Sequence, residues 1–222
     1  VPVVAIVGYT NAGKSTLLNH LTGAEIPANN RLFDTLDTTT RTLEISDTCT
    51  VLLSDTVGFI RKLPHHLIEA FRSTLEEAKY ADFIIHVVDA SNPQREKQMD
   101  IVYETLHNLG VEGKKIITLF NKQDKLEQED VIKDLKADVT LKISAVTGEG
   151  FAQVKETLEE VLREDKQLLE GVFPYELAGQ IAIIRKYGEL LEEEYRDNGI
   201  YVRAFVPVEL YQNLNAGFIH VK

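Results

Sequence analysis

An eight-residue stretch near the start of the chain, Gly8 to Ser15, limits the fold more than any other feature. It reads G-Y-T-N-A-G-K-S, follows an apolar run over 3–7 and precedes a helical pattern over 16–21. A glycine-rich turn between a buried strand and a helix surrounds an anion with backbone N–H groups at the positive end of the helix. The two glycines let the backbone approach where a Cβ atom would collide. The pattern therefore predicts a loop that binds the phosphates of a nucleotide.

The residue types inside this loop suggest individual roles. We expect Lys14 to reach the β- and γ-phosphate oxygens and the Ser15 hydroxyl to ligate Mg²⁺. An ordinary strand–turn–helix would not need Lys and Ser directly after the second glycine, so we favour the phosphate-binding interpretation. The other residues expected to contact the nucleotide here are Gly8, Asn11, Ala12, Gly13 and Thr16.

Composition narrows the class of protein. The chain has 222 residues, enough for one large domain or a large and a small one, and its net charge is −11. With no basic block, tight non-specific binding to nucleic acid is disfavoured, although a local basic patch stays open. A single cysteine, Cys49, excludes internal disulfides and is expected to be a buried strand residue.

The apolar patterning argues against a membrane protein. No apolar run approaches the ~18 residues of a membrane span and there is no signal peptide, so we expect a cytoplasmic protein. We also expect a monomer. The first strand starts at the first residues, which suggests a piece of a longer protein.

A second motif lies at the end of the strand expected over 50–54. It reads D-T-V-G, from Asp55 to Gly58. An Asp at the carboxyl end of an apolar strand, followed three residues later by Gly, is typical of a nucleotide switch. We expect the Asp55 carboxylate to hold the metal through water and the Gly58 N–H to meet the γ-phosphate.

A third motif, N-K-Q-D, follows the strand expected over 116–120. The Asp124 carboxylate can accept from guanine N1–H and N2–H₂ together, whereas adenine offers neither donor there. Asn121 can bind the guanine O6 or N7 edge and tie loops together, and the Lys122 stem can cover the base. Ser144 and Ala145 close the next strand and are both expected to bind the nucleotide, with the Ala145 backbone N–H placed to meet guanine O6.

The order of elements predicts an α/β fold. Strands alternating with helices indicate a doubly wound, mostly parallel sheet whose ligands lie beyond the carboxyl ends of the strands. All three motifs fall at such ends. A polar, threonine-rich loop is expected over 23–41. The remaining expected strands are 42–46, 83–89 and 139–143, and the remaining helices are 65–79, 94–109 and 148–162.

The tail, 170–222, is too long to be an extension of the last helix. Its centre, Asn198-Gly199, is a strong hairpin signal between strands expected over 189–197 and 200–206. Further strands are expected over 171–175 and 218–221, and helices over 176–186 and 208–214. The order βαββαβ predicts a small α+β, ferredoxin-like domain.

Together the motifs resemble the translation-factor-like GTPases over residues 3–164. The stretches 33–41, F-D-T-L-D-T-T-T-R, and 55–59, D-T-V-G-F, resemble the HflX family, with patterns close to T-L-D-P-T-T-R and D-T-V-G-F. Thr38 stands where the family usually has Pro. The resemblance implies a P-loop GTPase domain over 1–165 and a small C-terminal domain over 170–222. It also implies that a threonine, Thr40 rather than Thr39, completes the Mg²⁺ shell.

Two positions bear on the mechanism that the resemblance implies. Phe59 stands where Ras-like proteins carry a water-orienting Gln, so slow intrinsic turnover and acceleration by an ion or partner are expected. Asn11 stands where potassium-dependent relatives carry an Asn that helps to hold K⁺, which would do the electrostatic work of an arginine finger. Arg41 and Arg61 are weaker candidates for such a finger.

The expected function is a molecular switch that hydrolyses GTP to GDP and phosphate. Lys14, Gly58, Thr40 and Asn11 are its candidate catalytic residues, and Ser15, Thr40 and Asp55 are its candidate Mg²⁺ ligands. By resemblance its partner is the ribosome, above all the large subunit. Contact would run mainly through the family's N-terminal domain, which has no counterpart in these residues. The alternatives are a GTPase of RNA modification or ribosome assembly, and a largely non-hydrolysing, nucleotide-dependent protein-binding scaffold.

Overall fold

The structure, a computed structural model, describes residues 1–23, 39–55, 76, 78–127, 132–214 and 219–220. The helix expected over 65–79 falls largely outside these ranges, as does most of the threonine-rich stretch 23–41. The described chain divides into two compact units. The larger unit comprises Pro2–Glu44 and Val51–Val154, and the smaller unit comprises Val1, Ile45–Thr50 and Lys155–Lys222.

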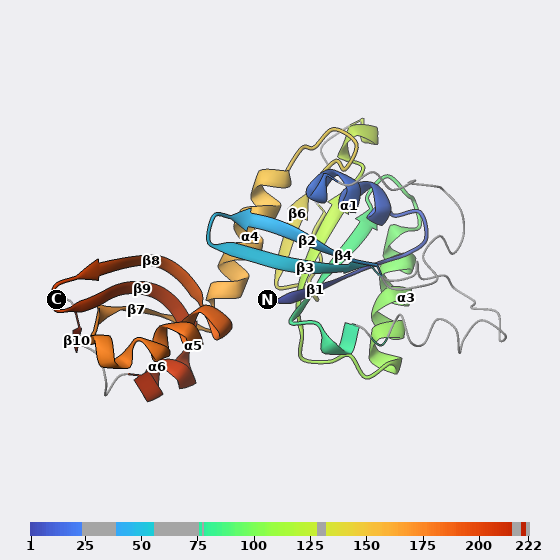
Figure 1. Ribbon diagram of the computed structural model, residues 1–222. Helices are drawn as coiled ribbons and strands as arrows, with labels where there is room; N and C mark the ends of the chain where they lie inside the picture. Colours follow the sequence, from blue (N-terminus) through green and yellow to red (C-terminus); the bar gives the residue numbers. More distant parts are fainter. Residues whose placement is uncertain (24–38, 56–75, 77, 128–131, 215–218, 221–222) are drawn as a thin grey trace. The chain divides into compact units, whose positions relative to one another are not determined.

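The larger unit is built on a six-stranded sheet with the order β2-β3-β1-β4-β5-β6 (Figure 1). Every pair in the succession β3-β1-β4-β5-β6 is parallel. A two-residue turn at Asp47 and Thr48 joins β2 to β3. The strands are β1 (Val3–Gly8), β2 (Thr39–Ser46), β3 (Cys49–Asp55), β4 (Phe83–Asp89), β5 (Lys115–Asn121) and β6 (Val139–Lys142). The predicted doubly wound, mostly parallel α/β fold is confirmed.

In the part of this unit that the structure describes, the helices with defined bounds are α1 (Lys14–Thr22) and α3 (Arg95–Asn108). The helix α4 (Phe151–Arg163) begins in this unit and continues into the smaller one. One core forms where Val102 and Leu106 of α3 pack with Ala5 and Val7 of β1. The apolar run of β1 is buried on both faces, as a central parallel strand requires. The strand therefore delivers its last residue, Gly8, to the carboxyl edge of the sheet.

Two boundaries of the sheet and helices described above differ by three residues from those predicted, and the others differ by two residues or fewer. The strand β2 begins at Thr39, so 39–41 belong to the hairpin with β3 and not to the expected loop. The helix α4 begins at Phe151, three residues late, because the Ser144 N–H donates to the Glu149 carbonyl at 3.1 Å and holds the intervening residues in a turn.

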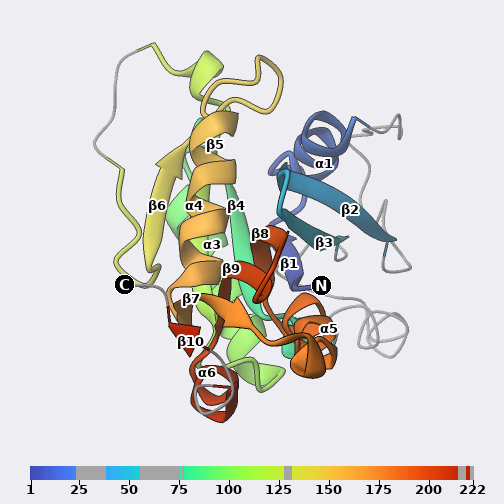
Figure 2. The same cartoon turned by 60° about the vertical axis from the view of Figure 1, so that its left-hand side comes forward.

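The smaller unit has the predicted order of elements, β7-α5-β8-β9-α6-β10. Its sheet order is β10-β7-β9-β8, and each neighbouring pair is antiparallel, which is the ferredoxin-like topology. Figure 1 and Figure 2 show α5 and α6 on the same face of this sheet, in orange to red. The elements are β7 (Lys166–Phe173), a 3₁₀ turn (Tyr175–Leu177), α5 (Gly179–Tyr187), β8 (Glu189–Arg196), β9 (Gly199–Pro207), α6 (Val208–Leu214) and β10 (Ile219–His220).

The core of this small domain explains its topology. Ile181 and Ile184 of α5 and Leu214 of α6 pack on the inward side chains of β7 and β9, including Leu169 and Val202. Every second residue of β9 from Ile200 to Val206 belongs to this core, as expected for a sheet covered on one face.

The expected start of the first strand in this domain, residue 171, is wrong. The strand β7 begins at Lys166, which pairs with Pro207, and it ends at Phe173. The polar residues near the start of β7 do not show a strand pattern in the sequence. Pairing along the whole length of β9 sets the extent of β7 in the structure. The hairpin turn lies at 197–198, because Arg196 pairs with Gly199 as the first rung of the ladder.

Candidate nucleotide-binding site

The glycine-rich loop joins β1 directly to α1. Gly13 precedes the helix with φ 102°, a left-handed conformation that side chains rarely adopt. A Cβ atom at this position would lie 2.2 Å from Asn121 Nδ2. The helix starts at once, since the Leu17 N–H donates to the Gly13 carbonyl at 3.0 Å. The positive end of α1 therefore begins at the loop, as anion binding requires.

Lys14 and Asp55 bring a cation and a carboxylate together at the carboxyl ends of β1 and β3. Lys14 Nζ lies 3.6 Å from Asp55 Oδ1, and both side chains are largely buried. In the parallel pair β1–β3, Asp55 is level with Ile6. Buried charges are costly unless they are paired or serve a ligand. This pair therefore marks a place built for ions.

The donor set at this place fits Mg²⁺ in chemistry. Ser15 is half-buried in the first turn of α1, and Asp55 supplies a buried carboxylate, so the oxygens are of the hard type that Mg²⁺ prefers. Within the described ranges no group of three or more His, Cys, Asp or Glu forms an all-protein metal cage. One carboxylate plus a hydroxyl suits a metal whose remaining ligands are water and phosphate oxygens.

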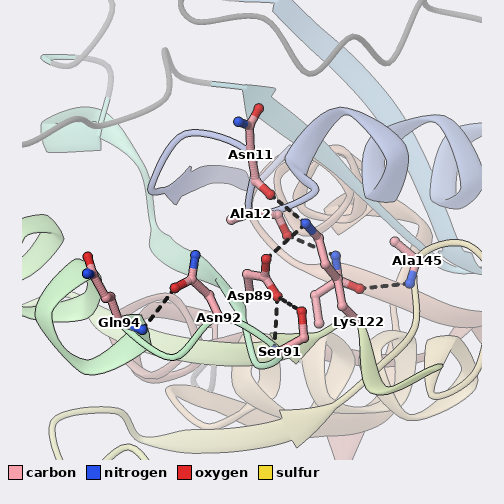
Figure 3. Close-up of polar contacts among 9 residues, drawn as sticks. Asn11, Ala12, Asp89, Ser91, Asn92, Gln94, Lys122 and Ala145 are labelled. Atoms are coloured by element: carbon pink, nitrogen blue, oxygen red, sulfur yellow. Dashed lines mark hydrogen bonds and ion pairs between the residues drawn. The ribbon is translucent and has the colours of Figure 1, made fainter. Parts of the chain in front are cut away.

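Asn121 ties three loops together. Its Nδ2 donates to the Ala12 carbonyl at 2.9 Å, and its Oδ1 accepts from the Ala145 N–H at 2.9 Å (Figure 3). The side chain is 2% exposed. The residue at the end of β5 thereby fixes the phosphate loop against the loop after β6. The sequence predicted that Asn121 ties loops together, and its hydrogen bonds do so. The sequence also predicted that the Ala145 N–H meets guanine O6, whereas in this structure that N–H donates to Asn121 Oδ1.

Lys122 reaches from the same motif to the phosphate loop. Its Nζ donates to the Asn11 carbonyl at 2.8 Å and to Asp89 Oδ2 at 3.0 Å (Figure 3). Asp89 ends β4, and its other carboxylate oxygen accepts from the N–H and the hydroxyl of Ser91 at 3.0 and 2.6 Å. The side chain of Asn11 takes no part in the contact with Lys122, which uses the backbone oxygen.

Asp124 follows in a 3₁₀ turn, Gln123–Lys125, and is oriented by the next loop. Ser144 Oγ donates to Asp124 Oδ1 at 2.8 Å and accepts from the Thr147 N–H at 3.2 Å. Ser144 is fully buried. One carboxylate oxygen of Asp124 is thus held from behind, in the arrangement that a base-reading carboxylate needs.

The structure brings together most of the predicted site. The phosphate loop, Asp55 and the N-K-x-D loop lie at the carboxyl edge of one sheet. Thr40 is an exposed residue near the start of β2. Gly58, with Phe59 and Arg61, lies outside the described residues. Sequence reasoning missed Asp89 and Ser91, although an Asp at the carboxyl end of β4, level with Asn121 of β5, was a signal.

These features define a class. A phosphate loop, a carboxylate at the end of the neighbouring strand and an N-K-x-D loop on a mostly parallel sheet are the parts of a P-loop GTPase domain. The family described as "50S ribosome-binding GTPase" matches residues 3–122, more than half of the chain. The chain belongs to this GTPase family.

Curated relatives confirm the resemblance to HflX. The chain is 58% identical to GTPase HflX of Lacrimispora saccharolytica, over 96% of this chain and 51% of that protein. It is 43% identical to GTPase HflX of Caldanaerobacter subterraneus, over 96% of this chain and 49% of that protein. The chain therefore spans about half the length of these relatives.

A solved structure confirms the fold. A GTP-binding protein from the archaeon Sulfolobus solfataricus, in complex with GDP, superposes with a TM-score of 0.60 at 30% identity. The match covers 72% of this chain and 52% of that one. None of the helices in the described part of the chain is long and apolar enough to cross a membrane.

Proposed function

We propose that the chain binds GTP and GDP at the carboxyl edge of the larger sheet and hydrolyses GTP to GDP and phosphate. The observation that carries this proposal is the convergence of the phosphate loop and the guanine-type motif on Asn121, with hydrogen bonds of 2.9 Å to Ala12 and Ala145. A shared support for both loops is what a ligand with a phosphate end and a base end requires. Similarity to GTPase HflX proteins and to a GDP complex supports the same ligand.

The residues of the chain would divide the work. When nucleotide binds, the Lys14 ammonium group would leave its ion pair with Asp55 and pair with the β- and γ-phosphate oxygens. The first N–H groups of α1 would stabilise the negative charge of the same phosphates. Ser15, Asp55 and Thr40 would hold Mg²⁺, which when bound neutralises charge on the phosphates. The Gly58 N–H would meet the γ-phosphate, and Asn11 is the candidate to hold K⁺ beside it.

Base selectivity would rest on Asp124, and a single substitution tests it. Asp124→Asn replaces an acceptor by a group that also donates, so guanine nucleotides should bind more weakly and xanthine nucleotides better. The measurement is competitive displacement of a fluorescent GDP analogue by GDP and by XDP. Unchanged preference would exclude Asp124 from base reading.

We further propose that the switch acts on the ribosome, through the large subunit. The family description and the HflX relatives support this partner. The test is single-turnover GTP hydrolysis by the 222-residue chain in KCl and in NaCl, each with and without large subunits. Faster hydrolysis with subunits is the expected result for a ribosomal role.

The other outcomes distinguish the parts of the proposal. Stimulation by K⁺ alone would support the role of Asn11 and place ribosome contact outside these residues. Tight GTP binding with no hydrolysis under any of the four conditions would contradict the hydrolase and favour a nucleotide-dependent scaffold. A partner in RNA modification would be indicated by stimulation with its RNA and not with subunits.

A further inference from the structure

Lys122 occupies an unusual backbone position that aims its side chain across the site. Its φ is 65°, one of two positive values among non-glycine residues in the described chain, the other being that of Asn11. Such a conformation costs about 1 kcal/mol or more, and the surrounding contacts must hold it. The contacts are those of its Nζ, at 2.8 Å from the Asn11 carbonyl and 3.0 Å from Asp89 Oδ2.

Hydrogen bonds within its own loop orient the Asp89 carboxylate independently of Lys122. One carboxylate oxygen accepts from both the N–H and the hydroxyl of Ser91, which leaves the other directed at Lys122 (Figure 3). The backbone is held as well, since Asp89 pairs with Asn121 in the parallel ladder and the Ala90 N–H donates to the Asn121 carbonyl at 3.0 Å. The carboxylate is therefore preorganised relative to β5, the strand that ends directly before Lys122.

The ion pair between Lys122 and Asp89 is partly buried. Side-chain exposure is 20% for Lys122 and 14% for Asp89. Fixing a lysine side chain costs up to about 2 kcal/mol of conformational entropy. Because Asp89 already holds the Lys122 side chain in place, a ligand that needs this lysine in the same position does not have to supply that entropy cost when it binds.

We propose that Asp89 is a positioning residue that acts through Lys122 to slow the release of guanine nucleotide. The inference rests on the proposed function, because it takes guanine nucleotide as the ligand. Lys122 links the guanine-recognition loop to the phosphate loop, and the two loops hold opposite ends of that ligand. Loosening Lys122 lets the loops separate, and separation is the first step of release. The contacts of the Asp89 carboxylate are with Ser91 and Lys122, so its effect on the nucleotide would run through that lysine.

The test is stopped-flow displacement of mant-GDP by excess GDP from the full 222-residue chain. Asp89→Ala should raise the dissociation rate about tenfold, the size expected for one charge-assisted hydrogen bond. Lys122→Met should raise it at least as much. The double variant should release no faster than Lys122→Met, because Asp89 acts only through that lysine. Rate increases that multiply in the double variant would overturn the proposal, as would an unchanged rate in Asp89→Ala.

A neighbouring residue provides the matched control. Asn92 lies in the same loop and its Oδ1 accepts from the Gln94 N–H at 2.9 Å, without contact to Lys122 (Figure 3). Asn92→Ala should leave release within about twofold of the unmodified chain. An increase equal to that of Asp89→Ala would assign the effect to general loosening of the loop and overturn the proposal.

Two further variants keep the test decisive if Asp89→Ala fails to fold. Asp89→Asn retains an acceptor oxygen but not the charge, and Ser91→Ala retains the carboxylate but removes the hydroxyl that holds it. Both should give intermediate rates, and rates equal to that of the unmodified chain would contradict the role of Asp89. Failure of the unmodified chain to retain mant-GDP would instead contradict the proposed function.

Discussion

The side-chain amide of Asn121 fills the space next to Gly13, so closely that a Cβ atom on residue 13 would lie 2.2 Å from Asn121 Nδ2. The second glycine of the phosphate loop is thus required by a side chain of the guanine-type motif as well as by its own backbone, with φ 102°. The two motifs are dependent on each other in packing, although far apart in the sequence.

Gly13→Ala should therefore damage both stability and nucleotide binding. Backbone strain costs roughly 1–3 kcal/mol, and displacement of Asn121 from its buried hydrogen bonds costs about 1–3 kcal/mol more. Urea unfolding and mant-GDP titration measure the two effects. Gly113→Ala is the control, since Gly113 also has a positive φ, of 71°, but no atom lies within 4 Å of its added Cβ. Equal losses in both variants would show that strain alone matters.

Ser144→Ala should weaken guanine-nucleotide binding, because the substitution removes a hydrogen bond that orients Asp124. The lost hydroxyl holds Asp124 Oδ1 at 2.8 Å, and a hydrogen bond to a charged group contributes about 1.5–3 kcal/mol. We expect GDP affinity, measured by titration, to fall about tenfold or more. Thr147→Ala is the control, because it removes the acceptor of the Glu149 N–H, at 3.3 Å, and leaves Asp124 in place. A similar loss in the control would argue against orientation of Asp124.

His86 should make stability fall in mild acid. Burial lowers the pKa of this imidazole, 1% exposed on β4, to about 4, while the nearby Asp134 charge opposes the shift. The unfolded chain takes up a proton near pH 6.5 and the folded chain does not, so the contribution is present above pH 6.5 and is lost as the pH falls towards 4. The slope is about 1.4 kcal/mol per pH unit.

The measurement is the free energy of unfolding in urea at pH 7.5 and pH 5.5. His86→Phe keeps an aromatic ring against Tyr103, whose ring meets that of His86 at 5.2 Å and 90°, and it should remove this part of the pH dependence. His107→Gln, at an exposed histidine, is the control and should keep it. Equal pH dependence in all three proteins would contradict the role of His86.

Cys49 should be nearly inert in the folded protein. It is 7% exposed, and burial, reinforced by the charges of Glu189 and Glu159, raises its pKa to about 11. At pH 8 the thiolate fraction is then roughly a hundredfold below that of an exposed cysteine. Because the chain has one cysteine, DTNB reports this site alone. Reaction at similar rates in buffer and in urea would contradict the prediction.

The parts of the site that lie in contiguous motifs could be predicted from the sequence. Lys14 and Asn121 follow from residue types at fixed spacing after apolar strands, because the carboxyl ends of parallel strands meet at one edge. The pairing of Asp89 with Lys122 could not be predicted, because it depends on which side chains meet across 33 residues. The start of β7 was missed for a related reason. The polar residues at the start of β7 are held in the sheet by pairing with β9, and the hydrophobic pattern of β7 itself does not indicate a strand there.

The strand β8 is the terminal strand of the smaller sheet in the part of the chain that the structure describes. Four of its eight residues are glutamates, Glu189 and 192–194. A terminal strand offers unpaired backbone groups to any strand of another molecule, and charged side chains along the edge oppose that addition. Arg163, Arg185 and Arg196 pair with Glu189, Glu193 and Glu194, so this edge carries fixed ion pairs as well as the charge of Glu192. A strand added from another molecule would have to pass these charged groups, which disfavours ordered self-aggregation in concentrated solution.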